Sequence, residues 1–275
     1  MSNVMRAPAA WAAEGMGAVR DVIVRMATDR RAAAAGLVML GIGVGFVFAY
    51  RAVQVRAPDG ELAHLLALGR DGALPELYGY LLALIVAGGL VAAWWRTGVL
   101  AYAVGALAFV FVFADDAFMY HERVGRRLAA RADIPALPGL RAQDTGELIA
   151  WGAAGLVLAA LLAWSAAQRT GTTVRVLTLL GGMIAALGVF GAGMDMLHIY
   201  SGRGLFTYIE DGGELVVLAL SAWAAIAVAR APWRGVLRDD AASDAWRGLR
   251  TRMGRSAPPE PAGVRAGPPA APRRA

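Results

Sequence analysis

The chain has 275 residues, of which 58% are hydrophobic and only 17% charged, and this composition excludes an ordinary soluble domain. Cysteine is absent, which excludes disulfides, thiolate metal sites and cysteine nucleophiles. The formal net charge of +6 comes from arginine alone, because the sequence contains no lysine. In so apolar a chain the distribution of arginine indicates how the protein is oriented in a membrane. We therefore expect the lipid bilayer, and not nucleic acid, to be the main partner.

The apolar stretches predict an all-α fold, a polytopic membrane protein built as a six-transmembrane-helix bundle. A helix needs about 20 mostly apolar residues to cross the hydrocarbon of a bilayer, and six stretches meet this requirement. They lie near residues 33–50, 77–95, 98–119, 148–167, 175–199 and 213–230.

Arginine clusters on both flanks of these spans set the expected orientation. Five arginines precede the first span and seven occur between residues 230 and 255. Because positive residues favour the cytoplasmic side, both termini are predicted to be cytoplasmic in a bacterial inner membrane. The links 51–76, 120–147 and 200–212 then face outward. No short apolar core with a cleavage site precedes the first span, which we expect to act as an uncleaved anchor.

The predicted organisation has four parts. Residues 1–32 form a cytoplasmic amphipathic segment, which either lies in the membrane surface or packs on the bundle. Residues 33–230 form the transmembrane domain. Residues 231–253 are predicted to form a second cytoplasmic interfacial helix, and the Pro-, Ala- and Arg-rich tail 254–275 is predicted to be disordered.

Carboxylates and histidines gather at the outward ends of three spans. Span three ends in Asp115, Asp116, His121 and Glu122, span five contains Asp195 and His198, and span six begins with Glu210, Asp211 and Glu214. The remaining histidine, His64, lies in the first outward link. Ionisable groups in a membrane are costly and usually face the protein interior with a partner. The sequence therefore predicts a shared polar site in one layer.

Helical spacing decides which of these groups can converge. On a helix Asp195 and His198 are adjacent, and Glu210 stacks on Glu214. Asp116 and His121 are about 140° apart on a continuous helix.

The geometry of the third span adds a condition. Asp116 and His121 can serve one site together with Asp115 only if the helix unwinds near Met119.

Three interpretations of the acidic layer remain open. The first is a divalent metal site for zinc, iron or manganese, since carboxylate and imidazole ligands suit these ions. The second is a structural layer in which Arg123, Arg126, Arg127 and Arg203 neutralise the acids. The third is a proton or cation pathway. For the metal site the predicted ligands are Asp115, Asp116, His121, Asp195, His198, Glu210 and Glu214, with Glu122 as a possible general base.

These interpretations correspond to three functions. A metal-activated water suggests a hydrolase that acts on a lipid or another amphiphile. The first alternative is a non-catalytic subunit or assembly factor, whose partners would be the other subunits of a membrane complex. The second alternative is a proton- or cation-coupled transporter.

Two motifs carry a resemblance. "FADDAFMYHERV" is similar to a span end in uncharacterised bacterial multi-spanning membrane proteins, and "YIEDGGELVVLAL" is similar to the acidic start of a later span in the same proteins. More distantly, the chain resembles the membrane hydrolases that include alkaline ceramidases and progestin-receptor-like proteins. That likeness implies a helical bundle with zinc near one membrane face. The sequence lacks their late His-x-x-x-His-like pair and their seventh span.

Overall fold

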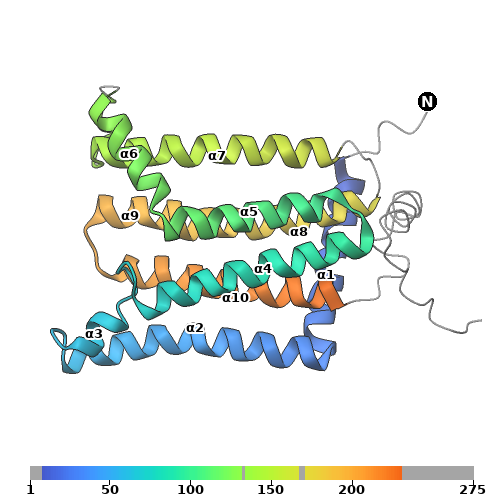
Figure 1. The fold of residues 1–275 in the computed structure, drawn as a ribbon, viewed down its shortest axis with the longest axis horizontal. Coiled ribbons are helices and arrows are strands. Elements are labelled where there is room, and N and C mark those ends of the chain that lie inside the picture. Colours follow the sequence, from blue (N-terminus) through green and yellow to red (C-terminus); the bar gives the residue numbers. More distant parts are fainter. Residues whose placement is uncertain (1–7, 132–133, 167–170, 231–275) are drawn as a thin grey trace, which may run out of the picture.

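Six long helices form the molecule (Figure 1). The computed structural model describes residues 8–131, 134–166 and 171–230, and every regular element in these ranges is helical. The long helices are α2 (Arg30–Arg56), α4 (Leu74–Thr97), α5 (Leu100–Ala117), α7 (Ala142–Ala166), α10 (Leu205–Arg230) and a composite of α8 (Gly171–Gly188), the π-helical turn η1 (Val189–Gly193) and α9 (Met194–Ser201). Each is long and apolar enough to cross a membrane, which confirms the six predicted spans and a multi-pass membrane protein.

Among the described residues, α1 (Pro8–Thr28) and three short helices lie at the two ends of the bundle. At one end α1 runs across the long helices (Figure 1). At the other end lie α3 (Glu61–Leu65), α6 (Tyr120–Arg131) and α9. These three helices carry His64, His121 and His198, so the predicted grouping of all three histidines at one end is confirmed.

Three of the spans that begin earlier than the sequence predicts are extended through acidic residues. The predicted starts at 77, 148 and 213 become Leu74, Ala142 and Leu205. In each case the added turns contain acids, which lower the hydropathy without interrupting the helix. Glu210, Asp211 and Glu214 therefore lie inside α10, not at its start.

The helix α1 packs on the bundle within the predicted segment 1–32. Ala18 and Val22 are buried, and the indole Nε1 of Trp223 on α10 donates a hydrogen bond of 3.0 Å to the carbonyl of Met26. Asp29 caps α2 and also accepts a hydrogen bond of 2.9 Å from Arg230. The predictions for 231–253 and 254–275 concern residues outside the described ranges.

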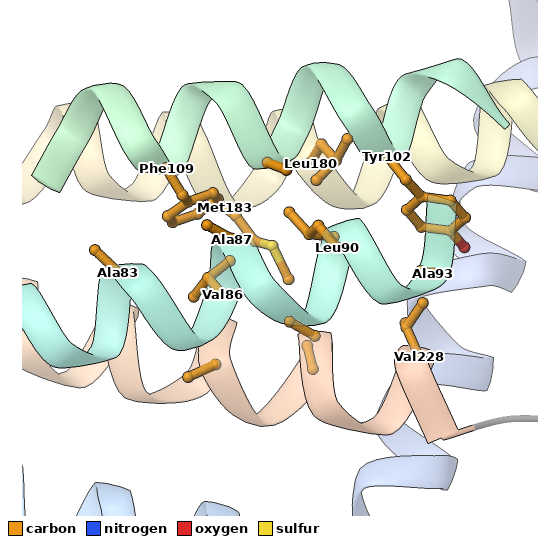
Figure 2. Close-up of a cluster of buried hydrophobic side chains, with 14 of the residues drawn as sticks. Ala83, Val86, Ala87, Leu90, Ala93, Tyr102, Phe109, Leu180, Met183 and Val228 are labelled. Atoms are coloured by element: carbon orange, nitrogen blue, oxygen red, sulfur yellow. The ribbon is translucent and has the colours of Figure 1, made fainter. Parts of the chain in front are cut away.

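The apolar core lies where α4 packs between α5 and α10, and α8 contributes side chains to it (Figure 2). Leu82, Val86 and Leu90 are fully buried on one face of α4, with Phe109 of α5 and Leu180 of α8 across from them. Side chains from four spans thus interdigitate, as the close packing of helices in a bilayer requires.

A pair of glycines lets α6 and α7 approach closely. A Cβ atom added at Gly146 would lie 2.6 Å from the backbone oxygen of Gly125, and one at Gly125 would lie 2.9 Å from the backbone oxygen of Gln143. Small residues of this kind permit backbone contact between membrane helices. The contact anchors α6 beside the first turns of α7.

We predict that Gly146→Ala destabilises the protein by about 1–3 kcal/mol, because the added methyl group meets backbone atoms that cannot give way. Thermal or denaturant unfolding in detergent measures the effect. Gly152→Ala on the same helix is the control, because a Cβ atom at Gly152 would meet nothing within 4 Å. Equal losses of stability in the two variants would contradict the close approach.

Candidate metal centre

The helix is interrupted between α5 and α6, at the position where Asp115, Asp116 and His121 can share a site only if the helix unwinds. The helix α5 ends at Ala117, Met119 adopts a left-handed conformation with φ +47°, and α6 begins at Tyr120. A left-handed conformation is uncommon for a residue with a Cβ atom. The unwinding near Met119 that the sequence analysis required is therefore present, and it turns α6 away from the axis of α5.

Asp115 joins the two sides of this break. Its carboxylate is 6% exposed, and its Oδ1 accepts the backbone N–H of His121 at 2.9 Å, as in a helix cap. Its Oδ2 lies 3.0 Å from Nδ1 of the His121 ring. Asp115 thus stabilises the first turn of α6 and also orients the imidazole of His121.

Two further interactions define the state of His121. Its ring packs edge-on against Trp151 of α7, with centroids 5.0 Å apart. Burial lowers the pKa of His121, but the hydrogen bond and negative charge of Asp115 outweigh it and raise the pKa above the ordinary value. Glu147 of α7 adds to this increase.

Asp115, Asp116 and His121 form one compact group, called here the α5–α6 group. One potential ligand atom from each of the three lies within 4.8 Å of the other two. The three atoms would have to move closer together to bind one ion, since zinc binds imidazole and carboxylate ligands at about 2.0–2.2 Å. Within the described ranges, the chemistry of this donor set fits a divalent transition metal.

Two cavities meet beside the α5–α6 group. The larger has a volume of about 650 Å³ and lies among α5, α6, α7, α8 and α10, and the smaller, of about 70 Å³, lies among α4, α5, α10 and the chain near Leu68. Asp116 and Glu214 line both cavities, and Asp115 lines the larger one. Asp116 and Glu214 therefore stand between a large, mainly apolar space and a small one lined by four acids.

The predicted residues of spans five and six form a second group. Nδ1 of His198 on α9 lies 3.2 Å from Oε2 of Glu210 on α10, and the hydroxyl of Thr207 lies 3.3 Å from Nε2 of the same ring. Both nitrogens of His198 thus have partners within this second group. Asp195 lies within electrostatic range of His121 and His198, between the two groups.

Glu214 packs against the π-helical turn. A Cβ atom at Gly191 in η1 would collide with the Glu214 carboxylate, so the glycine leaves space for it. Irregular turns of this type are frequent at functional sites, because they bring backbone and side chain into positions that a regular helix does not reach.

Two arginine pairs at this end of the bundle involve other acids. Arg126 donates to Glu122 at 2.9 Å on a partly exposed face of α6, and Arg141 binds Asp144 at 2.6 Å at the start of α7. Glu122, the predicted general base, does not line either cavity. Arg126 and Arg141 are therefore paired with acids outside the α5–α6 group.

Several polar residues near the site were missed by the sequence analysis. Glu76 lines the smaller cavity and accepts hydrogen bonds from the backbone of Gly72 and the hydroxyl of Tyr80. Glu147 is buried and accepts a hydrogen bond of 2.8 Å from Gln143. Pro75 at the first turn of α4 is a helix-start signal that would have brought Glu76 into the span.

Comparison with known proteins gives a family but no activity. Residues 32–230 match the family model described as a domain of unknown function (DUF8692). No curated protein and no solved structure matches the chain. The predicted resemblance is confirmed at the level of a family without assigned function, and the more distant likeness to membrane hydrolases stays a prediction.

We predict that Met119→Gly leaves the protein as stable or stabilises it by up to about 1 kcal/mol, because glycine adopts the left-handed conformation without the cost that a side chain adds. Met119→Ile should destabilise it, since a branched Cβ raises that cost. Unfolding midpoints measure both changes.

Phe118→Gly is the matched control, because Phe118 has an ordinary φ of −110°. A glycine there gains nothing from its freedom and should only weaken the chain. If Met119→Gly lowered stability as much as Phe118→Gly, the left-handed break would be contradicted.

Proposed function

The chain belongs to the DUF8692 family, whose description names no activity, and we propose that it is a membrane protein that binds a divalent transition metal through Asp115, Asp116 and His121. Zinc, iron and manganese all accept this combination of carboxylate and imidazole ligands. The observation that carries the proposal is the convergence of three ligand atoms within 4.8 Å across a broken helix.

A metal in this position would support hydrolysis of an amphiphile. A bound divalent ion lowers the pKa of a coordinated water and so supplies a nucleophile near neutral pH. Three protein ligands leave a coordination position open for that water. Glu214, which lines both cavities beside Asp116, is better situated than Glu122 to accept the proton as general base. The apolar cavity next to the group suits an amphiphilic substrate.

The proposed setting follows from the arginine distribution. We propose a bacterial inner membrane with both termini in the cytoplasm, which puts the α5–α6 group at the extracytoplasmic face. Asp195, His198 and Glu210 then belong to the same face as a second polar layer that supports the helix ends. The ligand set of the proposal is accordingly smaller than the seven residues predicted from the sequence.

A proton or cation pathway is the second candidate function. The smaller cavity is lined by Glu76, Asp116, Asp211 and Glu214, and Oδ2 of Asp211 is buried without a hydrogen-bond partner among the described residues. Towards the α1 end, however, the hydroxyls of Ser165 and Thr178 donate hydrogen bonds to carbonyls of their own helices. These two hydroxyls therefore do not continue a polar pathway from the smaller cavity. Proton flux in liposomes that disappears in Asp211→Asn would favour this candidate.

The metal proposal is tested on protein purified without a polyhistidine tag. We predict about one equivalent of zinc, iron or manganese by elemental mass spectrometry. Asp116→Asn and His121→Ala should weaken metal binding by at least about 10- to 100-fold, the loss that removal of even an outer hydrogen-bond partner of a ligand causes.

His64→Ala provides the matched control, because His64 is an exposed histidine at the same end of the bundle. This variant should retain its metal. Metal-free wild-type protein that also fails to bind added zinc, iron or manganese would refute the proposal, as would equal metal loss in His64→Ala and His121→Ala.

A further inference from the structure

The larger cavity has the size and shape of a site for one hydrocarbon chain. Its volume of about 650 Å³ falls within the range of about 300–1,000 Å³ that is typical of small-molecule sites. Along α7 its wall extends from Ile149 to Leu161, which corresponds to about 18 Å of helix. Most of the wall is aliphatic or aromatic, so the space is long and apolar.

The cavity reaches the surface of the bundle that faces lipid. Its lining includes Leu107 and Phe111 of α5 and Ile149 and Val157 of α7, and all four side chains are at least 40% exposed. In a helix that spans a bilayer, exposed apolar side chains contact acyl chains. A hydrocarbon chain can therefore enter sideways from the membrane, between α5 and α7.

Only one end of the cavity carries carboxyl groups. Asp115, Asp116 and Glu214 lie at that end, and no arginine or histidine contributes to the described lining. His121 is already paired with Asp115, so an anionic headgroup such as a carboxylate or phosphate at Asp116 and Glu214 would meet acids without a basic partner of its own. Charge complementarity therefore selects a cationic or metal-binding headgroup.

We propose that this cavity binds a long-chain alkylamine, with its hydrocarbon chain along α7 and its nitrogen at Asp116 and Glu214. An ammonium group pairs with the two carboxylates, and the same nitrogen in its neutral form is a metal ligand. The headgroup thus fits the acidic end with or without a metal ion. This inference rests on the proposed function in one respect: it names the ligand class of the apolar cavity in which that function places an amphiphile.

The experiment uses the full chain in lipid nanodiscs and a diazirine-bearing hexadecylamine as photolabel, with a diazirine-bearing palmitate as the anionic counterpart. The amine should label residues of α5 and α7 that line the cavity, and unlabelled hexadecylamine should compete. The palmitate probe should label these residues about tenfold less, which corresponds to about 1.4 kcal/mol of binding free energy.

Glycine pairs in the spans supply matched variants. Gly155 and Gly188 line the cavity, whereas Gly152 and Gly182 do not, and a Cβ atom at any of the four would meet nothing within 4 Å. Gly155→Leu should reduce labelling by about tenfold by filling the cavity, and Gly152→Leu should leave it unchanged. If Gly155→Leu does not fold, Gly188→Leu with Gly182→Leu as its control makes the same test.

Several results would overturn the inference. They are equal labelling by the two probes, labelling outside the cavity only, and labelling that is insensitive to both cavity-filling variants. Amine labelling that persists after treatment with a chelator would support the cavity independently of the metal. Retained labelling in protein that is purified without metal and fails to bind added zinc, iron or manganese would refute the proposed metal centre alone.

Discussion

The hydrogen bonds of one buried carboxylate connect the membrane span α5 to the candidate site. Asp115 accepts the backbone N–H of His121 and also contacts its imidazole, across a turn in which Met119 is left-handed. Without this turn, a continuous helix would carry Asp116 and His121 to different faces. A carboxylate in a low-dielectric environment needs such partners, so the same contacts that satisfy Asp115 also assemble the α5–α6 group.

Close backbone approaches build the walls around that group. The contact of Gly125 with Gly146 brings α6 against α7, and the π-helical turn at Gly191 makes room for Glu214. Together they leave a large apolar space on one side of Asp116 and a small space lined by several acids on the other. Asp116 and Glu214 thus line both spaces.

The hydrophobic spans and their shared polar end could be predicted from the sequence, because length and hydropathy determine which segments cross a membrane. The need for unwinding at Met119 also followed from helical spacing. Two things could not be predicted. Hydropathy does not show that helices continue through Glu76 or Glu147, and one-dimensional spacing does not show that His198 turns to Glu210 and not to the group around His121. Such choices depend on how neighbouring helices pack.

X-ray absorption spectroscopy at the edge of the bound metal tests the central claim most directly, namely that the break at Met119 lets one imidazole and two carboxylates bind a single ion. The account predicts nitrogen and oxygen ligands at about 2.0–2.2 Å with the scattering pattern of one imidazole, and loss of that pattern in His121→Ala. A first shell of oxygen ligands alone, or an imidazole pattern unchanged in His121→Ala, would contradict it.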